Sequence, residues 1–366
     1  MKIVIIGGHL SPALSIIENL KNGEVFFVGR KYAIEGDKTV SLEYQIINNL
    51  KIPFFELNTA RFQRKFTRYT LSSFLKLPVG FLQSVKILKK IGPDVVVGFG
   101  GYVSIPVVIS AYFLKIPVVL HEQTLEAGFA NKILAFAASK ICISWESSFK
   151  FFPKAKTLLT GLPIKKEIIA VKKDIKNRKD LPFIYITGGS LGSHKINTLV
   201  YEILPRLLEN FYVFHQTGDS EFKDYEKHKE LKSSLKEEFS KRYEVVKYLK
   251  NKEVTEILSK SDIVISRAGV NTIAELLFLQ KPAFLIPIPF SQRNEQLKNA
   301  LVLKNAGIGE IGEEKTLTPE IFLGRLLYMK RNLNNYKINS LDKIPDENAS
   351  YKIIKVLQDV AKKKKT

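Results

Sequence analysis

The chain has 366 residues and only one cysteine, Cys142. One thiol cannot form a disulfide framework or a metal site built from several thiolates, and it suits a reducing compartment such as the cytoplasm. The chain also contains no Asp-x-Asp motif. In metal-dependent sugar transfer, paired aspartates hold a divalent ion on the donor diphosphate, so this absence disfavours that architecture.

Long apolar runs are also scarce. The first one, Ile3–Ile6, is too short for the core of a secretory signal and is followed by glycines, so we expect no signal peptide. The stretch Val95–Leu114 lacks charge over about the length of a membrane-spanning helix. It contains three glycines and Pro106, which break helices, and this disfavours a membrane span. We predict a strand, a glycine turn and a helix there, in a soluble or peripheral protein.

Acidic residues are few relative to basic ones: 36 Asp and Glu stand against 57 Lys and Arg, a formal net charge of +21. This excess predicts an anionic partner, which on charge alone is a membrane surface, a nucleic acid or a phosphorylated substrate. With 45% hydrophobic residues, the chain is too apolar for disorder and too long for one ordinary core. Two domains are therefore expected.

Short β-branched runs alternate with longer segments of helical spacing, and the strand runs are apolar throughout. This alternation is typical of α/β domains with parallel sheets covered on both faces. The predicted strands are Lys2–Ile6, Val25–Val28, Asp94–Val97, Pro117–Leu120, Lys140–Ile143, Pro182–Thr187, Tyr212–His215, Asp262–Ser266 and Pro282–Pro287. The predicted helices are Pro12–Lys21, Leu77–Lys90, His194–Leu208, Asn271–Leu279 and one within Asn348–Thr366.

The strands fall into two sets on either side of residues 149–181, with a hinge predicted near Thr160–Ile164. We therefore predict two Rossmann-like lobes that face a cleft. The first lobe comprises residues 1–163 and the second comprises residues 164–345. Residues 346–366 are predicted to form a C-terminal helix with a basic, solvated tail.

Four predicted strands run directly into glycine-bearing turns. At the carboxyl end of a parallel strand, glycine lets the backbone approach a ligand, and the helix that follows offers free N–H groups to phosphate. Glycine turns also serve packing alone, so each turn by itself is ambiguous, whereas two in each lobe favour ligand binding. The turns are Ile6–His9, Gly98–Tyr102, Gly188–Gly192 and Ser266–Thr272.

Polar groups near these turns allow two interpretations. His9 ends a strand in a glycine turn, where it is either a general base or a hydrogen-bonded residue that only fixes the turn. Glu275 follows Thr272 by three residues, as in a helix-capping arrangement, but a carboxylate there also suits the ribose hydroxyls of a nucleotide. The polar stretch His121–Gln123 likewise ends a strand and offers its groups to the predicted cleft.

Residues 61–90 carry eight cations and no acid, interleaved with aromatic and aliphatic side chains. An apolar patch ringed by cations binds anionic lipid head groups while inserting shallowly. The alternative is a core-packing helix with a solvated basic face. RNA binding uses similar chemistry, but no nucleic-acid motif accompanies the segment, so we expect no nucleic-acid partner. The predicted membrane patch comprises Arg61, Arg64, Lys65, Arg68, Phe74, Leu75, Lys76 and Phe81.

Six motifs occur in order along nearly the whole chain. They are Gly-Gly-His-x-x-Pro-Ala at Gly7–Ala13, Pro-Asp-Val-Val-Val-Gly-x-Gly-Gly-Tyr-Val-Ser at Pro93–Ser104, Ile-Pro-Val-Val-Leu-His-Glu-Gln at Ile116–Gln123, Gly-Gly-Ser-x-Gly at Gly188–Gly192, Ser-Arg-Ala-Gly-x-x-Thr-x-x-Glu at Ser266–Glu275 and Asn-Glu-Gln-x-x-Asn-Ala at Asn294–Ala300. Together they resemble the undecaprenyl-diphospho-muramoylpentapeptide N-acetylglucosaminyltransferases of bacterial peptidoglycan synthesis.

The resemblance implies a GT-B fold and an inverting glycosyltransferase that needs neither a metal nor another cofactor. The enzymes of this family transfer N-acetylglucosamine from UDP-N-acetylglucosamine to lipid I, a polyprenyl-diphosphate-linked muramoyl peptide, and so make lipid II. The resemblance also implies a peripheral enzyme on the cytoplasmic face of the plasma membrane, in contact with anionic inner-leaflet lipids.

The family pattern also assigns roles to the residues that match it. The second lobe binds the donor, and the first lobe binds the acceptor and the membrane. His9 and Glu122 are the catalytic candidates. The donor-binding candidates are Lys165, Gly189, Ser190, Leu249, Arg267, Gly269, Thr272, Glu275 and Gln296, and the acceptor-binding candidates are Gly7, Gly8, Tyr102, Gln123 and Thr124.

The sequence departs from the family pattern at several positions. The first loop, Gly-Gly-Thr-Gly-Gly-His in the family, is about three residues shorter here, and Thr124 stands in place of Asn. Leu191 replaces a Gln, while Leu162 and Lys165 replace the Asn and Arg of Gly-Asn-Pro-x-Arg. Most of these changes fall at acceptor, sugar or hinge positions, so the sequence supports the nucleotide site better than the exact sugar or acceptor.

Three other functions fit parts of the sequence. A related glycolipid synthase, which adds a sugar from a UDP-sugar to diacylglycerol, would tolerate a shortened diphosphate cradle. A UDP-sugar 2-epimerase uses a double-lobe scaffold of the same kind but has no use for a basic aromatic segment. A catalytically reduced UDP-sugar-binding or lipid-binding protein would account for the losses in the loops.

Overall fold

The structure is a computed structural model that describes residues 1–32, 39–58, 68–171, 181–189, 191–340 and 344–363, with the backbone only over residues 68–77 and at Gln292. The chain divides into two compact units. Unit 1 comprises Met1–Lys165 together with Asp346–Thr366, and unit 2 comprises Lys166–Pro345. The predicted lobe boundary after residue 163 lies two residues before this division.

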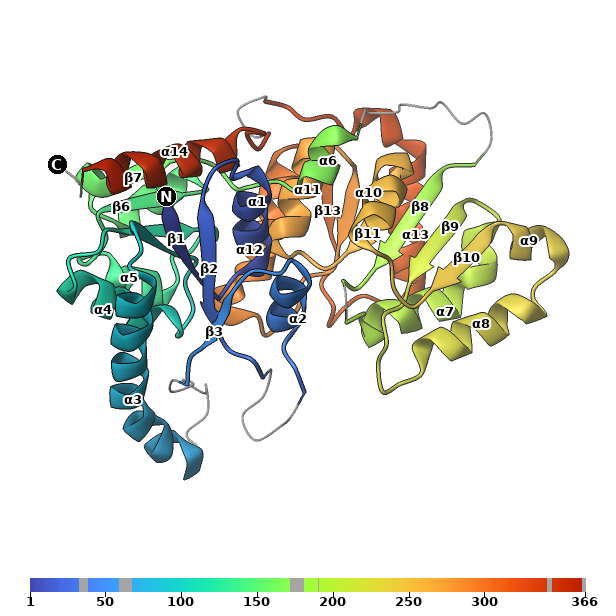
Figure 1. Cartoon of the computed structure of the whole chain (residues 1–366). Coiled ribbons are helices and arrows are strands. Elements are labelled where there is room, and N and C mark those ends of the chain that lie inside the picture. The colour runs from blue at the N-terminus through green and yellow to red at the C-terminus, as the bar shows by residue number, and fades with distance from the viewer. Residues whose placement is uncertain (33–38, 59–67, 172–180, 190, 341–343, 364–366) are drawn as a thin grey trace. The chain divides into compact units, whose positions relative to one another are not determined.

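Unit 1 contains a seven-stranded parallel sheet with the order β3-β2-β1-β4-β5-β6-β7 (Figure 1). Its strands are β1 (Lys2–Ile6), β2 (Glu24–Gly29), β3 (Phe54–Glu56), β4 (Val95–Gly98), β5 (Val118–Glu122), β6 (Lys140–Ile143) and β7 (Thr157–Leu159). Its helices are α1 (Leu10–Asn19), α2 (Leu42–Asn49), α3 (Arg68–Ile91), α4 (Ser104–Phe113), α5 (Phe129–Leu134) and α14 (Ala349–Lys362). The five strands predicted in this part of the chain are all present.

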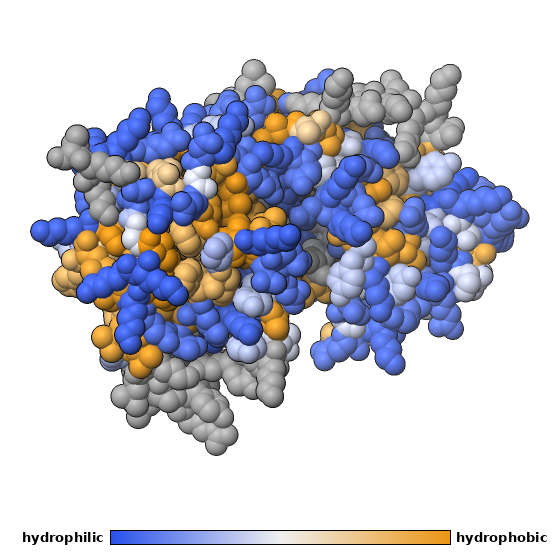
Figure 2. All heavy atoms as spheres, in the orientation of Figure 1, coloured by the Kyte–Doolittle hydropathy of each residue, from blue (hydrophilic) through white to orange (hydrophobic). Residues whose placement is uncertain are grey.

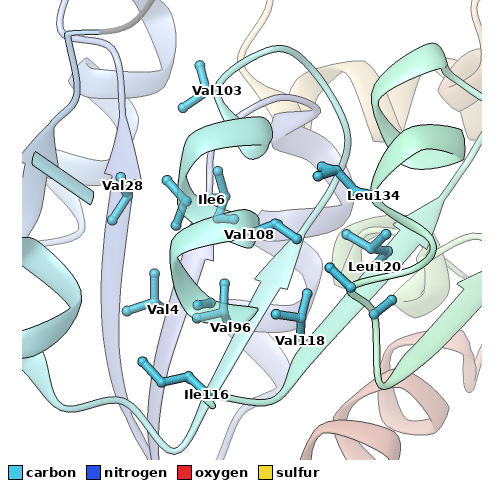
Figure 3. Packing of buried hydrophobic residues seen from close by; sticks show 14 of the residues in the cluster. Val4, Ile6, Val28, Val96, Val103, Val108, Ile116, Val118, Leu120 and Leu134 are labelled. Atoms are coloured by element: carbon cyan, nitrogen blue, oxygen red, sulfur yellow. The ribbon is translucent and has the colours of Figure 1, made fainter. Parts of the chain in front are cut away.

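Both faces of this sheet are buried, which explains why its inner strands are apolar throughout. Successive side chains of a strand point to opposite faces. Val4 and Ile6 pack with Val108 of α4 and with other residues of α3, α4 and α5 (Figure 3). Ile3 and Ile5 pack on the opposite face with residues of α1, α2 and α14.

Helix α3 differs from its prediction at the amino end. The sequence predicted a start at Leu77, next to Pro78, but α3 begins at Arg68 and continues through Pro78. Proline removes one backbone N–H and usually breaks or kinks a helix, so it favoured a start at this point. The basic aromatic segment therefore becomes helical earlier than predicted.

The C-terminal helix α14 belongs to unit 1. It packs beside α1 and buries Ile353 and Leu357 against the sheet. The Ser15 hydroxyl of α1 donates to the carbonyl oxygen of Ile164 at 2.9 Å, and Ser350 of α14 donates to the Ser15 oxygen at 2.8 Å. Two buried hydroxyl groups thus connect the segment around Ile164, near the end of Met1–Lys165, with the C-terminal helix α14.

Unit 2 contains a six-stranded parallel sheet with the order β10-β9-β8-β11-β12-β13 (Figure 1). Its strands are β8 (Phe183–Thr187), β9 (Tyr212–Gln216), β10 (Tyr243–Val246), β11 (Ile263–Ser266), β12 (Ala283–Leu285) and β13 (Gly309–Ile311). Its helices are α6 (Lys166–Ala170), α7 (His194–Leu208), α8 (Asp224–Ser234), α9 (Glu237–Lys241), α10 (Asn251–Lys260), α11 (Val270–Leu279), α12 (Glu295–Asn305) and α13 (Pro319–Arg331). Helices α7 and α13 cover one face through a common apolar cluster.

The strand order of each unit reverses at one point, and the candidate sites are expected at these two points. In unit 1 the chain passes from β1 outward to β2 and β3, then returns to β4 on the other side of β1. Unit 2 repeats this pattern with β8 and β11. Ligands of open α/β sheets bind outside the carboxyl ends of the strands at such switch points. All four predicted glycine turns follow these four strands.

Candidate functional site

The first candidate site lies in unit 1, where β1 and β4 end side by side. The turn after β1 touches the turn after β4, and a Cβ on Gly8 would overlap with the carbonyl oxygen of Gly100. Because the two backbones approach so closely, position 8 has no room for a side chain. The predicted acceptor residue Gly8 therefore lies directly against the second glycine turn, and Gly7 precedes it in the same turn.

His9 lies at the start of α1, and its side chain is exposed. Its Nδ1 is 2.8 Å from the carbonyl oxygen of Phe99. A carbonyl oxygen only accepts hydrogen bonds, so Nδ1 carries the hydrogen and Nε2 of the neutral ring carries the lone pair. The contact fixes the turn, and it also selects the tautomer whose Nε2 can act as a base. A structural role in the turn and a role as general base are therefore compatible for His9.

Glu122, the last residue of β5, is buried and accepts four hydrogen bonds. Oε1 accepts from the backbone and hydroxyl of Thr124 at 3.0 and 2.6 Å. Oε2 accepts from the backbone of Gly128 at 2.8 Å and from the amide of Asn131 at 3.0 Å. These donors leave the carboxylate little capacity to take a proton from a substrate. The geometry favours a role in fixing this loop for Glu122 and Thr124.

His121 and Gln123, on either side of Glu122, are also buried. Burial lowers the pKa of His121 to about 4, so its ring is neutral at neutral pH. The side-chain amide of Gln123 has no hydrogen-bond partner among the described residues, and the same holds for Nδ1 of His121. Buried polar atoms nearly always have partners, so the end of β5 has unused hydrogen-bonding capacity.

Tyr102, a predicted acceptor residue, follows the turn after β4. Its hydroxyl accepts a hydrogen bond from Nη1 of Arg30 at 2.8 Å, and the guanidinium carbon lies 5.8 Å from the centre of the ring. Arg30 was not predicted from the sequence as a site residue, because it belongs to no motif. It directly follows β2, so it brings a cation to the same edge of the sheet as His9.

The second candidate site lies in unit 2, where β8 and β11 end. The turn after β8 is very tight: Gly189 and Gly192 have φ angles of +88° and +74°. A Cβ on Gly192 would overlap with the carbonyl oxygen of Thr217, which follows β9. The hydroxyl of Ser193 then accepts from the backbone of Ile196 and caps α7. The predicted donor residue Ser190 lies outside the described residues.

A buried network of hydrogen bonds supports the turn after β8. Asn197 of α7 donates to the carbonyl oxygen of Thr217 at 3.0 Å and to Asp224 at 2.9 Å. Its side-chain oxygen contacts Nε2 of His215 at 3.0 Å. Since Thr217 is the residue against which Gly192 packs, this network fixes the position of the glycine turn.

The turn after β11 leads into helix α11. Gly269 precedes this helix in an extended conformation, and Thr272 lies in its first turn. The amino end of a helix offers free backbone N–H groups to an anion, as predicted for the diphosphate. Arg267, in contrast, donates to the carbonyl oxygen of Ile286 at 3.0 Å and forms an ion pair with Glu314. In this structure its guanidinium is therefore paired within unit 2.

Glu275 lies one turn further along α11 and is half-buried. Its charge contributes to the raised pKa of Tyr185, although burial of the phenol is the larger cause. Tyr185 lies in the middle of β8, so the charge of Glu275 acts on this neighbouring strand. Gln296 begins α12 and its Oε1 accepts from the backbone of Ile288 at 3.0 Å. Both residues belong to unit 2.

Two further donor candidates lie apart from these turns. Leu249 is half-buried in the loop between β10 and α10. Lys165 is the last residue of the first segment of unit 1, and the other donor candidates belong to unit 2. Neither residue lies in one of the four glycine turns.

The predicted membrane patch is only partly described. Arg61, Arg64 and Lys65 lie outside the described residues, and the backbone alone is described for Arg68, Phe74, Leu75 and Lys76. Phe81 is half-buried, and its carbonyl oxygen accepts from Ser110 of α4 at 3.4 Å.

A further apolar patch on α4 and α5 was missed in the sequence. Five side chains there are exposed, and Figure 2 shows apolar residues gathered over these helices. The rings of Tyr112 and Phe136 lie 5.6 Å apart. Because α3 packs along α4, this surface adjoins the basic helix. We name it the α4–α5 patch, and it consists of Tyr112, Phe113, Phe129, Ile133 and Phe136.

Among the described residues, no group of three or more His, Cys, Asp or Glu side chains is arranged to hold a metal ion. No helix in the described part of the chain combines the length and the apolar character needed to cross a membrane.

Comparisons with known proteins cover both units. Residues 6–143 match the N-terminal domain of glycosyltransferase family 28, and residues 183–357 match the C-terminal domain of that family. A protein of Lachnospira eligens is 33% identical over 99% of each chain, and one of Clostridium botulinum is 36% identical over 97% of each chain. Both are named UDP-N-acetylglucosamine–N-acetylmuramyl-(pentapeptide) pyrophosphoryl-undecaprenol N-acetylglucosamine transferase.

Solved structures show the same fold. The crystal structure of Acinetobacter baumannii MurG has a TM-score of 0.75 at 23% identity and covers 98% of this chain and 100% of its own. A UDP-GlcNAc 2-epimerase from Neisseria meningitidis, bound to UDP-GlcNAc, has a TM-score of 0.66 at 15% identity with the same coverage. At these identities the likeness concerns the fold, and the predicted pair of Rossmann-like domains is confirmed.

Proposed function

We propose a function from the premise that this chain belongs to glycosyltransferase family 28, whose N-terminal and C-terminal domains it matches in order. The protein transfers N-acetylglucosamine from UDP-N-acetylglucosamine to lipid I and so makes lipid II. Its curated relatives, 33% and 36% identical over nearly their whole length, carry names that describe this reaction. The proposal also agrees with the motifs that predicted it from the sequence.

In this reaction the acceptor hydroxyl attacks the anomeric carbon of the donor sugar from the face opposite UDP. The C–O bond to the diphosphate breaks as the new glycosidic bond forms, and the hydroxyl proton passes to a base. His9 is our candidate base. The observation that carries this assignment is the 2.8 Å contact of Nδ1 with the Phe99 carbonyl, because it leaves the lone pair on the exposed ring at Nε2.

Unit 2 supplies the other half of the reaction. Negative charge develops on the diphosphate as it leaves, and the backbone N–H groups at the start of α11 suit this charge. The tight turn after β8, held by Asn197 and Thr217, allows a second backbone approach to the nucleotide. We assign Glu275 to the ribose and Gln296 to the sugar, following the family pattern.

We place the protein on the cytoplasmic face of the plasma membrane as a peripheral protein. The support is the α4–α5 patch, which exposes three aromatic rings of Phe and one of Tyr beside the basic helix α3. Exposed aromatic and aliphatic groups next to cations suit shallow insertion among anionic lipids. The net charge of +21 agrees with this partner.

The test is product identification after incubation of the full chain with UDP-N-acetylglucosamine and a short-chain lipid I analogue. We expect a disaccharide-bearing lipid product. His9→Ala should reduce kcat by about 100-fold or more, a typical contribution of a general base, while UDP affinity stays within about twofold. Unchanged kcat would remove His9 from the mechanism.

Parallel reactions separate the other functions. Diacylglycerol in place of lipid I tests the glycolipid synthase, and UDP-N-acetylglucosamine alone tests a 2-epimerase, whose fold is close to this one. A product in either reaction, without one from lipid I, would overturn the proposal.

A further inference from the structure

An unexpected carboxyl group lies at the first candidate site. Glu43 is in the first turn of α2, and its side chain reaches the turn after β1. A Cβ on Gly7 would overlap with the carboxyl group, and a Cβ on Gly29 would lie 3.2 Å from its Oε2. The carboxyl group therefore rests on the backbone of the same glycine turn that carries His9.

This carboxyl group is incompletely bonded. The backbone N–H of Gly8 bonds to it, but Oε1 is buried and has no hydrogen-bond partner among the described residues. A buried carboxylate oxygen without a partner is costly, and protonation or a ligand relieves that cost. Burial accordingly raises the pKa of Glu43 to about 7, against the smaller opposing effect of the Gly8 hydrogen bond.

Among the described residues, no cation forms an ion pair with Glu43. The turn after β1 carries the titratable group His9, whose Nδ1 is bonded to the carbonyl oxygen of Phe99. From the end of β2, Arg30 donates to Tyr102, and Lys31 lies 5.4 Å from the centre of the Tyr44 ring. The last residue of the neighbouring strand β3 is Glu56, which adds only negative charge.

We propose that Glu43 is an acceptor-site residue that is protonated when the acceptor binds and donates a hydrogen bond from its carboxyl group to a phosphate oxygen of the acceptor diphosphate. This inference rests on the proposed function. A diphosphate brought to this turn places negative charge beside the carboxyl group, and like charge favours the protonated form. The proton comes from solvent and no covalent bond changes. Acceptor binding is therefore linked to uptake of one proton.

The linkage predicts how acceptor binding depends on pH. Free protein with a pKa near 7 has Glu43 about nine-tenths protonated at pH 6 and about one-tenth protonated at pH 8. The KM for the acceptor should therefore rise about tenfold between these values. Glu43→Gln keeps the size of the side chain and always offers an N–H donor. Its acceptor KM should change less than about twofold and should be several-fold below that of the wild type at pH 8.

The experiment measures kcat and the acceptor KM separately from pH 6 to pH 8.5, with UDP-N-acetylglucosamine saturating. The kcat reports on the chemical step, and the pH dependence of the acceptor KM reports on Glu43. Asn48→Ala, on the exposed face of the same helix, is the matched control and should follow the wild type. If the acceptor KM changes with pH equally in Glu43→Gln and in the wild type, the proposal is overturned. Glu43 would then only support the turn.

A binding measurement keeps the inference independent of turnover. The lipid I analogue is titrated without donor, by calorimetry, in buffers of different ionisation enthalpy. Its diphosphate is esterified at both ends and does not titrate near neutral pH. At pH 7.5 the wild type should take up about 0.8 more proton per bound analogue than Glu43→Gln. Equal uptake refutes the role of Glu43, whereas proton-linked binding without any transfer refutes the proposed reaction alone. Absence of binding refutes both.

Discussion

Removal of one hydroxyl group from unit 2 should destabilise that unit measurably. The hydroxyl of Tyr243 lies between two buried imidazole rings, 3.1 Å from Nδ1 of His215 and 2.9 Å from Nδ1 of His228. Nε2 of His215 faces the side-chain oxygen of Asn197, and Nε2 of His228 faces its carbonyl oxygen, each at 3.0 Å. Both Nε2 atoms must therefore donate, and both Nδ1 atoms present lone pairs to Tyr243.

Both rings are neutral at neutral pH, because burial lowers the pKa of His228 to about 4 and that of His215 still further below its usual range. The single proton of Tyr243 thus serves two acceptors. Tyr243→Phe removes it, at a cost of about 1 kcal/mol for the hydrogen bond and about 1–3 kcal/mol for a buried nitrogen left unpaired. We expect unit 2 to lose about 2–4 kcal/mol, and its melting temperature to fall by roughly 4–16 °C.

The assay exploits the single tryptophan of the chain. Trp145 lies in unit 1, so its fluorescence reports on that unit, while far-UV circular dichroism follows both units. Guanidinium denaturation of Tyr243→Phe should shift the dichroism transition to lower concentration. Tyr201→Phe is the control, because Tyr201 is 43% exposed and its ring also contacts His228. A loss below about 0.5 kcal/mol in Tyr243→Phe, or an equal loss in the control, would refute the reasoning.

Three further predictions follow from the candidate sites. Gly192→Ala places a Cβ against the carbonyl oxygen of Thr217 at a φ of +74°, so UDP affinity should fall at least about tenfold by calorimetry, with the chain still folded by dichroism. Tyr112→Ser with Phe136→Ser should weaken binding to anionic vesicles several-fold in a sedimentation assay without reducing UDP affinity. The pKa of His121 is lowered on folding from about 6.5 to about 4, so the unfolded state binds more protons between these values and stability falls as pH drops through them. At pH 5 this loss is about 2 kcal/mol relative to neutral pH, and Trp145 fluorescence during urea denaturation should show it.

The sequence predicted the interior of both sheets and missed their edges. The nine predicted strands all occur, whereas β3, β7, β10 and β13 were not predicted, and these are the first and last strands of the two sheets. An edge strand has one neighbour and is partly exposed, so it needs no continuous apolar run. β3 and β13 have three residues each and contain a glutamate, so neither has the apolar run that predicts a buried strand.

The candidate sites were predictable where the backbone determines them. Glycine turns follow strand ends, so the positions of His9 and Gly192 could be read from their neighbours in the sequence. Side-chain pairing was not predictable, because it depends on residues far along the chain. Asn131 donates one of the four hydrogen bonds that Glu122 accepts, and Arg267 is paired with Glu314, which lies 47 residues further along the chain. Neither contact has a local pattern.

The position of Glu43 at the first candidate site was also not predictable from the sequence. It belongs to no motif, and it reaches the first glycine turn only because α2 packs beside β2 and β3. Its distance along the chain from the end of the preceding strand also conceals its role, since Glu43 lies 14 positions after Gly29, the last residue of β2.

The two strand-end sites differ in the kind of group that they contain, and this difference supports the assignment of acceptor and donor. The site of unit 1 contains groups that exchange protons, since His9 offers a lone pair and Glu43 has a pKa near 7. The site of unit 2 offers backbone N–H groups at a tight glycine turn and at the start of α11, above histidines that stay neutral. Deprotonation of a hydroxyl needs the first kind, and a leaving diphosphate needs the second. The pH dependence of transfer between pH 6 and pH 8 should therefore arise in unit 1.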